Sequence, residues 1–240
     1  MKNKLPQYLK KISAWLLPYH CILCNRPSER EKDLCTPCYQ DLPHLPQACR
    51  RCARPLFFEA SLCGRCMVEQ PAFDSTLATF LYKAPITQLI MQLKFASALV
   101  NARLLGELLA EAIQERPPAI WPEVIIPMPL HPARLKERGF NQAVEIGRSI
   151  ATRLQLPLDI SHCRRIKHTA AQATLSAEER IKNMKNAFHI TNMPYRQVAV
   201  IDDVMTTGQT LMAFSTALKK TGVETIQVWC SARAVENVQK

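Results

Sequence analysis

The stretch that decides the fold class is Val198–Thr210, which reads VAVIDDVMTTGQT. Its first four residues, 198–201, are apolar and mostly β-branched, which is typical of a buried strand in a parallel sheet. Two carboxylates follow, and a turn containing hydroxyl groups and one glycine then leads into a helix expected over 211–220. Strand, turn and helix in this order predict an α/β fold with a ligand site at the turn.

The turn has the composition of a phosphate-binding site. Backbone N–H groups at the start of a helix point outward, the helix dipole favours negative charge, and threonine hydroxyls add hydrogen-bond donors. A glycine lets the backbone come close to a ligand. The residues expected to bind phosphate are Thr206, Thr207, Gly208, Gln209 and Thr210.

Asp202 and Asp203 need a different role, because a carboxylate beside a phosphate group is repelled by it. A ribose diol, or a metal ion bridging the diol and a phosphate, would resolve that conflict. The predicted ligand is therefore a sugar phosphate. The alternative is a buried strand whose acids only cap the next helix.

The whole segment resembles the thirteen-residue motif with which type I phosphoribosyltransferases bind phosphoribosyl pyrophosphate. The resemblance implies that Asp202 and Asp203 take the two ribose hydroxyls, directly or through Mg²⁺, and that the turn holds the 5-phosphate. Mg²⁺ suits this arrangement because it prefers oxygen ligands, many of them from the substrate.

Two further stretches extend the resemblance. PLHPARLKERGFNQA (129–143) and RIKHTAAQATLSAEERIKNMKNAF (165–188) are similar to the ComF/GntX group of phosphoribosyltransferase-like proteins. The resemblance covers the chain from about Cys21 to Arg233. It implies that Arg138, in a loop between a strand and a helix, faces the pyrophosphate, and that the segment 165–180 is a mobile loop over the substrate. A plain solvated loop is the alternative for that segment.

Eight cysteines between residues 21 and 66 form four CxxC pairs. The arrangement of the first two pairs, with ten residues between them, returns 28 residues later, so the segment is an internal repeat. Two CxxC pairs commonly bind one tetrahedral Zn²⁺, and four thiolates leave no open coordination position. The sequence therefore predicts two structural zinc sites in tandem ribbons. Their ligands are Cys21, Cys24, Cys35, Cys38, Cys49, Cys52, Cys63 and Cys66.

Two questions about these cysteines stay open at this point. A cross-braced pairing, with the first CxxC joined to the third, is compatible with the spacing. Disulfides are the alternative to zinc, although they are rare in a reducing compartment. The basic residues Arg50, Arg51, Arg54 and Arg65 around the second repeat form either a nucleic-acid-binding face or an ordinary solvated surface.

Composition narrows the class of protein. The formal net charge of +11 favours anionic partners such as nucleotides or nucleic acid. No apolar run of roughly 18 residues exists, so no transmembrane segment is expected. The basic start, residues 1–18, lacks the apolar core length and the cleavage site of a signal peptide and is expected to be a short amphipathic helix that packs on the rest of the protein, with a peripheral membrane contact as the alternative. We expect a cytoplasmic protein.

The cysteines stop near Pro71, which predicts two domains: residues 1–70 with the N-terminal helix and zinc ribbons, and residues 71–240 with the phosphoribosyltransferase-like fold. In the second domain strands are expected at 75–82, 124–126, 158–166, 187–191 and 225–230, and helices at 86–95, 99–114 and 141–154. Lys94 is expected to extend along the surface to reach solvent, and contact with a substrate is the alternative.

Two functions are compatible with the sequence. One is a Mg²⁺-dependent phosphoribosyltransferase acting on an unidentified nitrogenous acceptor. The other is a non-catalytic accessory protein that binds single-stranded DNA and retains a ribose-phosphate site. The ComF/GntX group is associated with DNA uptake during competence and with the use of DNA as a nutrient, so the resemblance implies competence or DNA-uptake proteins as further partners.

Overall fold

The computed structural model describes residues 18–167 and 186–235. These belong to two compact units that divide between Pro43 and His44. The predicted N-terminal helix and most of the predicted mobile loop lie outside the described residues. The predicted domain boundary after residue 70 stays a prediction, although the contacts assign residues 44–70 to the larger unit.

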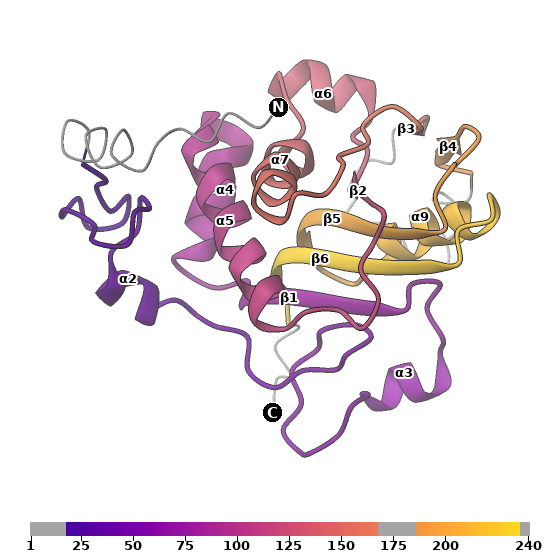
Figure 1. Ribbon diagram of the computed structural model, residues 1–240, viewed down its shortest axis with the longest axis horizontal. Coiled ribbons are helices and arrows are strands. Elements are labelled where there is room, and N and C mark those ends of the chain that lie inside the picture. Colours follow the sequence, from indigo (N-terminus) through magenta and orange to yellow (C-terminus); the bar gives the residue numbers. More distant parts are fainter. Residues whose placement is uncertain (1–17, 168–185, 236–240) are drawn as a thin grey trace, which may run out of the picture. The chain divides into compact units, whose positions relative to one another are not determined.

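A parallel sheet of four strands, in the order β1-β6-β5-β2, forms the centre of the larger unit (Figure 1). Its strands are β1 (Ser75–Leu81), β2 (Val124–Pro127), β5 (Gln197–Met205) and β6 (Thr225–Arg233). The apolar run at the start of β5 is fully buried between β2 and β6, as expected for a central parallel strand. The predicted α/β fold class is confirmed.

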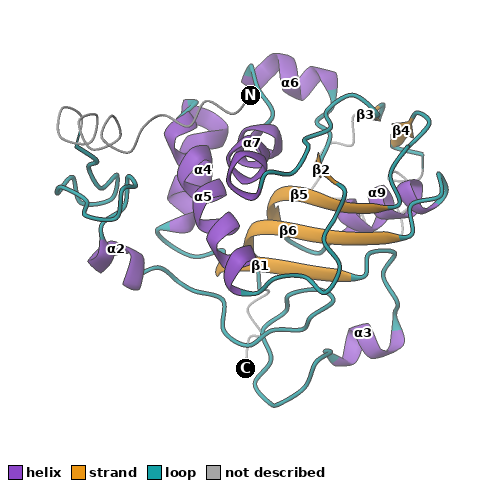
Figure 2. Ribbon diagram, viewed as in Figure 1, coloured by secondary structure: helices purple, strands orange, loops and turns teal. Residues whose placement is uncertain are grey.

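Helices cover both faces of this sheet (Figure 2). On one face α4 (Ile86–Ala96), α5 (Leu99–Glu115) and α7 (Gln142–Leu154) pack on alternate residues of β5, including Ala199 and Ile201. On the other face α9 (Gln209–Lys219) packs on Val198 and Val200. Successive side chains of a strand point to opposite faces, so the two carboxylates that follow on β5 also lie on opposite faces.

The structure corrects three of the expected element boundaries. β5 extends to Met205 and therefore contains both aspartates, because β6 continues to pair with it as far as Arg233. The strand expected over 158–166 is reduced to β3 (Cys163–Arg165), which pairs with β4 (Phe188–Ile190) as a separate antiparallel ribbon. The expected loop around Arg138 contains a short helix, α6 (Pro132–Arg138), capped by the His131 side chain.

The two cysteine repeats have matching backbone geometry. In the first ribbon (residues 21–38) the Cys21 N–H donates to the Arg26 carbonyl at 2.8 Å, and in the second ribbon (residues 49–66) the Cys49 N–H donates to the Arg54 carbonyl at 2.8 Å. Each ribbon contains one short helix, α2 (Thr36–Gln40) or α3 (Gly64–Val68). The repeat read from the sequence is therefore a repeat of structure.

Backbone contacts fix the second ribbon to the edge strand β1. The Thr76 N–H donates to the Arg50 carbonyl at 2.9 Å, and the Thr76 hydroxyl donates to the Arg51 carbonyl at 2.6 Å. Leu45, just before the ribbon, donates its N–H to the Thr79 carbonyl at 3.0 Å. The ribbon is thus held at the edge of the sheet by the backbone of its first CxxC pair.

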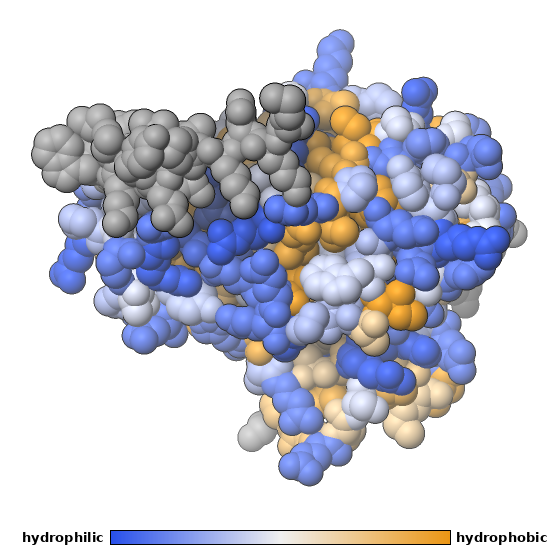
Figure 3. All heavy atoms as spheres, in the orientation of Figure 1, coloured by the Kyte–Doolittle hydropathy of each residue, from blue (hydrophilic) through white to orange (hydrophobic). Residues whose placement is uncertain are grey.

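The face in Figure 3 is predominantly hydrophilic, with apolar side chains gathered in narrow strips. Among the helices in 18–167 and 186–235, none combines the length and apolar character that a membrane crossing requires.

Candidate functional site

The predicted phosphate-binding turn lies between β5 and α9. Gly208 occupies the position before the first residue of α9 with φ of 80°, a left-handed conformation that favours glycine. Gly208 has no side chain to cap the helix, and the Gln209 N–H makes only a long contact with the Thr207 hydroxyl, at 3.5 Å, so the start of α9 can receive an anion. Thr206 and Thr207 are exposed beside it. A turn with a left-handed glycine therefore lies where the sequence predicts one, and phosphate binding by residues 206–210 stays a prediction.

The carboxylate pair, Asp202 and Asp203, lies at the carboxyl end of β5 immediately before this turn. Asp203 is 7% exposed and forms an ion pair with Lys94 of α4, with 2.5 Å between Nζ and Oδ2. Lys94 is itself mostly buried in this pair. The expectation that Lys94 extends along the surface is therefore wrong.

The Asp202 side chain leaves β5 on the opposite face from that of Asp203, but the two carboxylates interact at the end of the strand. Burial, together with the negative charge of Asp203, raises the pKa of Asp202 to about 8, although Lys94 acts in the other direction. Near neutral pH the pair therefore holds a proton and carries about one negative charge, which Lys94 balances. A divalent cation arriving at the pair would displace that proton.

Arginines of α6 and β3 lie near the carboxylate pair or near residues next to it. Burial lowers the pKa of Arg165, while the charge of Asp202 raises it and the charge of Arg134 lowers it further, so Arg165 lies within electrostatic reach of both. The Arg138 guanidinium lies 5.5 Å from the centre of the Phe95 ring. Phe95 follows Lys94 directly in the chain. The structure thus brings Arg138 to the same end of the sheet as the carboxylates.

The sequence predicted the carboxylates, the turn and Arg138 as site residues and gave substrate contact by Lys94 as an alternative, but it did not predict that Lys94 pairs with Asp203 or that Arg165 lies near Asp202. The one available signal for Lys94 was a single cation in the apolar segment QLKF. Its partner is far away in the chain, and only the packing of α4 against β5 brings the two together.

The residues of the carboxylate pair fit a hard cation. Their donor atoms are carboxylate oxygens, which Mg²⁺ prefers, and a site with only two protein carboxylates leaves the remaining ligands to substrate and water.

The cysteines gather within each repeat. The four Sγ atoms of Cys21, Cys24, Cys35 and Cys38 lie within 4.8 Å of one another, as do those of Cys49, Cys52, Cys63 and Cys66. The Sγ atoms of Cys24 and Cys35 are 3.7 Å apart and those of Cys52 and Cys63 are 3.6 Å apart. Tetrahedral zinc with Zn–S bonds of about 2.3 Å requires about 3.8 Å between sulfurs. The geometry fits two structural Zn²⁺ ions and excludes the cross-braced pairing.

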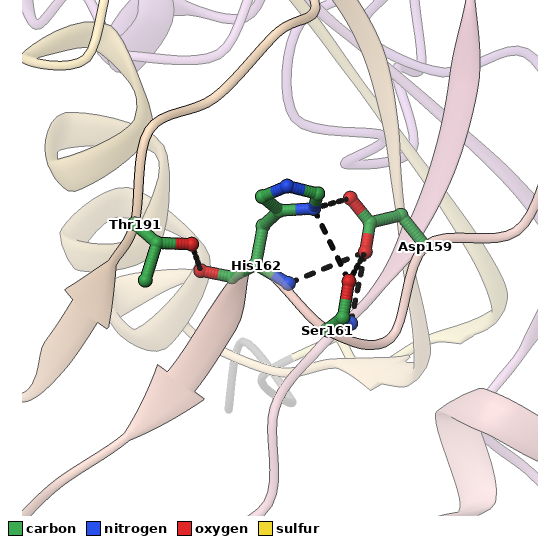
Figure 4. A network of polar contacts seen from close by, with 4 residues as sticks. All are labelled: Asp159, Ser161, His162 and Thr191. Atoms are coloured by element: carbon green, nitrogen blue, oxygen red, sulfur yellow. Dashed lines mark hydrogen bonds and ion pairs between the residues drawn. The ribbon is translucent and has the colours of Figure 1, made fainter.

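A second polar cluster contains serine, histidine and aspartate (Figure 4). Asp159 accepts hydrogen bonds from the Ser161 N–H at 2.8 Å and the Ser161 hydroxyl at 2.9 Å, and its other oxygen lies 2.5 Å from Nδ1 of His162. Ser161 also contacts Nδ1 of His162, at 3.2 Å. A catalytic triad needs the serine and the carboxylate on different ring nitrogens. The cluster therefore stabilises the turn before β3.

Comparison with known proteins gives the family. Residues 12–67 match the family model described as a double zinc ribbon domain. The chain is 37% identical over 224 residues to competence protein F of Haemophilus influenzae, covering 90% of this chain and 97% of that protein. It is 32% identical to the DNA utilization protein YhgH of Escherichia coli K12, covering 90% of each.

The chain belongs to the family of these proteins. The resemblance to the ComF/GntX group is thereby confirmed. Among solved structures, the adenine phosphoribosyltransferase of Leishmania tarentolae aligns with 64% of this chain and 74% of that chain at 14% identity and a TM-score of 0.37. A hypoxanthine phosphoribosyltransferase of Staphylococcus aureus aligns with 57% of this chain and 73% of that chain at 11% identity and a TM-score of 0.34.

Proposed function

We propose that this protein binds phosphoribosyl pyrophosphate together with Mg²⁺ at the carboxylate pair and the 206–210 turn, in the cytoplasm, and serves DNA uptake or the use of DNA as a nutrient. The observation that carries the proposal is a carboxylate pair on β5, with Asp203 buried and Asp202 partly buried, followed by a helix start on α9 that its N-cap residue does not cap. The names of the relatives, competence protein F and DNA utilization protein, support the biological context.

Each group has a role in binding. The N–H groups and hydroxyls of the 206–210 turn would hold the 5-phosphate. Asp202 and Asp203 would accept hydrogen bonds from the ribose hydroxyls, which requires Asp202 to release its proton. Lys94, freed from Asp203, and Arg138 would face the pyrophosphate, where Mg²⁺ would supply further positive charge.

A transferase reaction would follow from the same arrangement. The bond between C1 of the ribose and the pyrophosphate oxygen would break while a nitrogen acceptor approaches the opposite side of C1. Lys94 and Arg138 would stabilise the charge that develops on the departing pyrophosphate. No protein nucleophile is needed, because the protein positions the groups and excludes water.

The test is a calorimetric titration of phosphoribosyl pyrophosphate with Mg²⁺ into the wild-type protein and into the Asp202→Asn/Asp203→Asn variant. We expect metal-dependent binding by the wild type and none by the variant. Equal heats from both proteins, or no heat from either, would rule out the proposed site. With binding established, a panel of nucleobases and other nitrogenous acceptors tests turnover through pyrophosphate release.

The second candidate function is single-stranded DNA binding without turnover. The exposed arginines of the second ribbon favour it, because backbone phosphates dominate such binding. Salt-sensitive binding of an oligonucleotide, with no pyrophosphate released from the whole acceptor panel, would favour this function over the transferase.

A further inference from the structure

Two adjoining cavities lie between the second ribbon and the 206–210 turn, and they have several lining residues in common. The smaller, of about 140 Å³, is lined by Arg54, Arg65, Arg233, Thr206 and Thr207, together with Ala234 and Val235. The larger is a groove of about 800 Å³ along α9, and the same three arginines and Thr207 line it as well. Within the described part of the chain, neither carboxylate of the pair lines either cavity.

The smaller cavity has the charges and donors of an anion site. Its three guanidinium groups come from the ribbon and from the end of β6, and its two threonine hydroxyls come from the turn. Arg54 and Arg233 line the same cavity of about 140 Å³, so their two positive charges repel each other. An anion between them would remove that repulsion.

The three arginines are not equivalent. The Arg233 guanidinium is buried and donates to backbone carbonyls, so it is part of the wall. Arg54 is exposed and makes no side-chain hydrogen bond or ion pair with residues 18–167 or 186–235. Arg65 is exposed and pairs with Glu69, with 2.7 Å between Nε and Oε2, which leaves its terminal nitrogens for a ligand. Arg54 and Arg65 are therefore the cations that can bind an anion.

The groove has the character of a small-molecule site. Its volume falls in the range of about 300–1,000 Å³ that is usual for ligand pockets. Phe73, Ile190, Met212 and Ala213 give it apolar walls. Asn186, Gln209 and Glu69 also line it, and their side chains offer hydrogen bonds to the edge of a heteroaromatic ring.

We propose that this composite site binds a nucleoside monophosphate. Its phosphate group would lie between Arg54, Arg65 and the threonine hydroxyls, because guanidinium groups match phosphate geometry in a bidentate manner. Its base would occupy the apolar groove beside α9. The site shares Thr206 and Thr207 with the proposed phosphoribosyl pyrophosphate site, but it adds the ribbon arginines and the groove along α9 and uses neither the carboxylate pair nor Mg²⁺.

The competing explanation for the arginines is charge balance. Four thiolates around one Zn²⁺ carry a net charge of −2, which nearby arginines can neutralise. In that case their loss would reduce the zinc content or the thermal stability and would leave nucleotide binding unchanged. The experiment therefore measures binding, zinc content and thermal stability on the same samples.

The experiment is a calorimetric titration of 5′-AMP into the zinc-loaded full-length protein without Mg²⁺, beside adenosine, ribose 5-phosphate and inorganic phosphate. We expect 5′-AMP to bind more tightly than ribose 5-phosphate or phosphate, and adenosine to bind weakly. The Arg54→Gln/Arg65→Gln variant should lose at least about tenfold in affinity for 5′-AMP, as expected when charge-assisted hydrogen bonds are removed. Arg148→Gln/Arg153→Gln, which removes the same charge from α7, should retain wild-type affinity.

Two further variants keep the proposal testable if the arginine variant loses zinc. Thr216→Trp would fill the groove from the exposed side of α9 and should abolish 5′-AMP binding while inorganic phosphate still binds; because Cys52 and Cys66 line the same groove, its zinc content is measured as well. Glu69→Gln would remove the carboxylate that competes for Arg65 and should tighten 5′-AMP binding.

The outcomes separate this proposal from the proposed function. Asp202→Asn should retain 5′-AMP binding whether or not the wild type binds phosphoribosyl pyrophosphate with Mg²⁺. No 5′-AMP binding by the wild type would overturn the inference. So would equal affinities in the arginine variant and its α7 control, or loss of 5′-AMP binding in Asp202→Asn.

Discussion

The Arg233 side chain joins the second zinc ribbon to the end of β5. Its Nε donates to the carbonyl of Cys52 at 2.9 Å, and its Nη1 donates to the carbonyl of Met205 at 2.9 Å. Nη1 also contacts the carbonyls of Thr206 and Ala234. A proposed zinc ligand and the first residue of the 206–210 turn are therefore linked through one buried guanidinium group.

Replacing Arg233 should destabilise the protein. Arg233→Met would leave several buried carbonyls without donors, and each such group costs about 1–3 kcal/mol. We expect a loss of about 3 kcal/mol in the free energy of unfolding, measured by urea denaturation. Arg196→Met is the control, since Arg196 forms an exposed ion pair with Glu224 that is worth less than about 1 kcal/mol. Equal losses in the two variants would contradict this role for Arg233.

The two ribbons should differ in their influence on the turn. Cys49→Ser/Cys52→Ser should release one zinc ion and increase hydrogen exchange of the backbone amides at residues 205–208, because Arg233 then loses its fixed partner at Cys52. Cys21→Ser/Cys24→Ser should also release one zinc ion but should leave exchange at 205–208 unchanged, because the first ribbon belongs to the other unit. The same increase in both variants would argue against a link through Arg233.

Asp202 makes stability depend on pH. Its pKa in the folded protein, about 8, is above the usual carboxyl value of 3.8, so the folded state binds the proton more tightly than the unfolded state. The free energy of unfolding should therefore be highest below the unfolded pKa and should fall as the pH rises through the folded pKa. Asp202→Asn should remove this fall and exceed the wild type in stability by at least about 1 kcal/mol at pH 9.

Urea denaturation at pH 5.5, 7 and 9 checks this prediction. Identical pH profiles for the wild type and Asp202→Asn would show that Asp202 ionises normally. Asp202→Asn should also lose Mg²⁺-dependent ligand binding. In the wild type a cation can displace the proton of Asp202 and bind the carboxylate, whereas the amide of the variant offers no carboxylate.

The sequence predicted those features that depend on neighbouring residues. The apolar run 198–201, the glycine at position 208 and the CxxC spacing each restrict the local backbone, and the structure has a strand, a turn and two ribbons at these places. The ends of strands were predicted less well, because pairing with a neighbour decides them: β5 reaches Met205 only since β6 continues beside it.

Side-chain partnerships between distant segments could not be predicted. Lys94 and Asp203 are adjacent only because α4 packs across β5, and Arg233 reaches Cys52 only because the second ribbon docks on β1. No periodicity or motif in a single sequence encodes either pair. They are nevertheless the contacts that set the charge of the carboxylate pair and the position of the turn.

Lys94 should affect ligand binding more than stability. Lys94→Met would leave Asp203 without its partner and remove a cation from the proposed pyrophosphate side of the site. We expect at least about a tenfold loss in affinity for phosphoribosyl pyrophosphate with Mg²⁺, measured by calorimetry. Lys219→Met removes a more exposed lysine paired with Asp74 and should leave affinity unchanged. Weakened binding in both variants would indicate an effect of net charge alone.

Gly208 should tolerate no side chain without cost to the turn. Its φ of 80° disfavours alanine by roughly 1–2 kcal/mol, and an added Cβ would lie 2.7 Å from Cε of Met205. The Met205 side chain can move, so the backbone conformation accounts for most of the cost. Gly208→Ala should therefore reduce the free energy of unfolding and weaken binding of phosphoribosyl pyrophosphate.

Gly64→Ala is the matched control for Gly208→Ala. Gly64 lies in α3, and a Cβ there would meet no atom within 4 Å. Alanine at this position should stabilise the protein by about 0.4–1 kcal/mol, because it restricts the unfolded chain without strain in the folded one. Equal ligand affinities of Gly208→Ala and Gly64→Ala would contradict this prediction. Phosphate binding would then not require the left-handed backbone conformation at position 208.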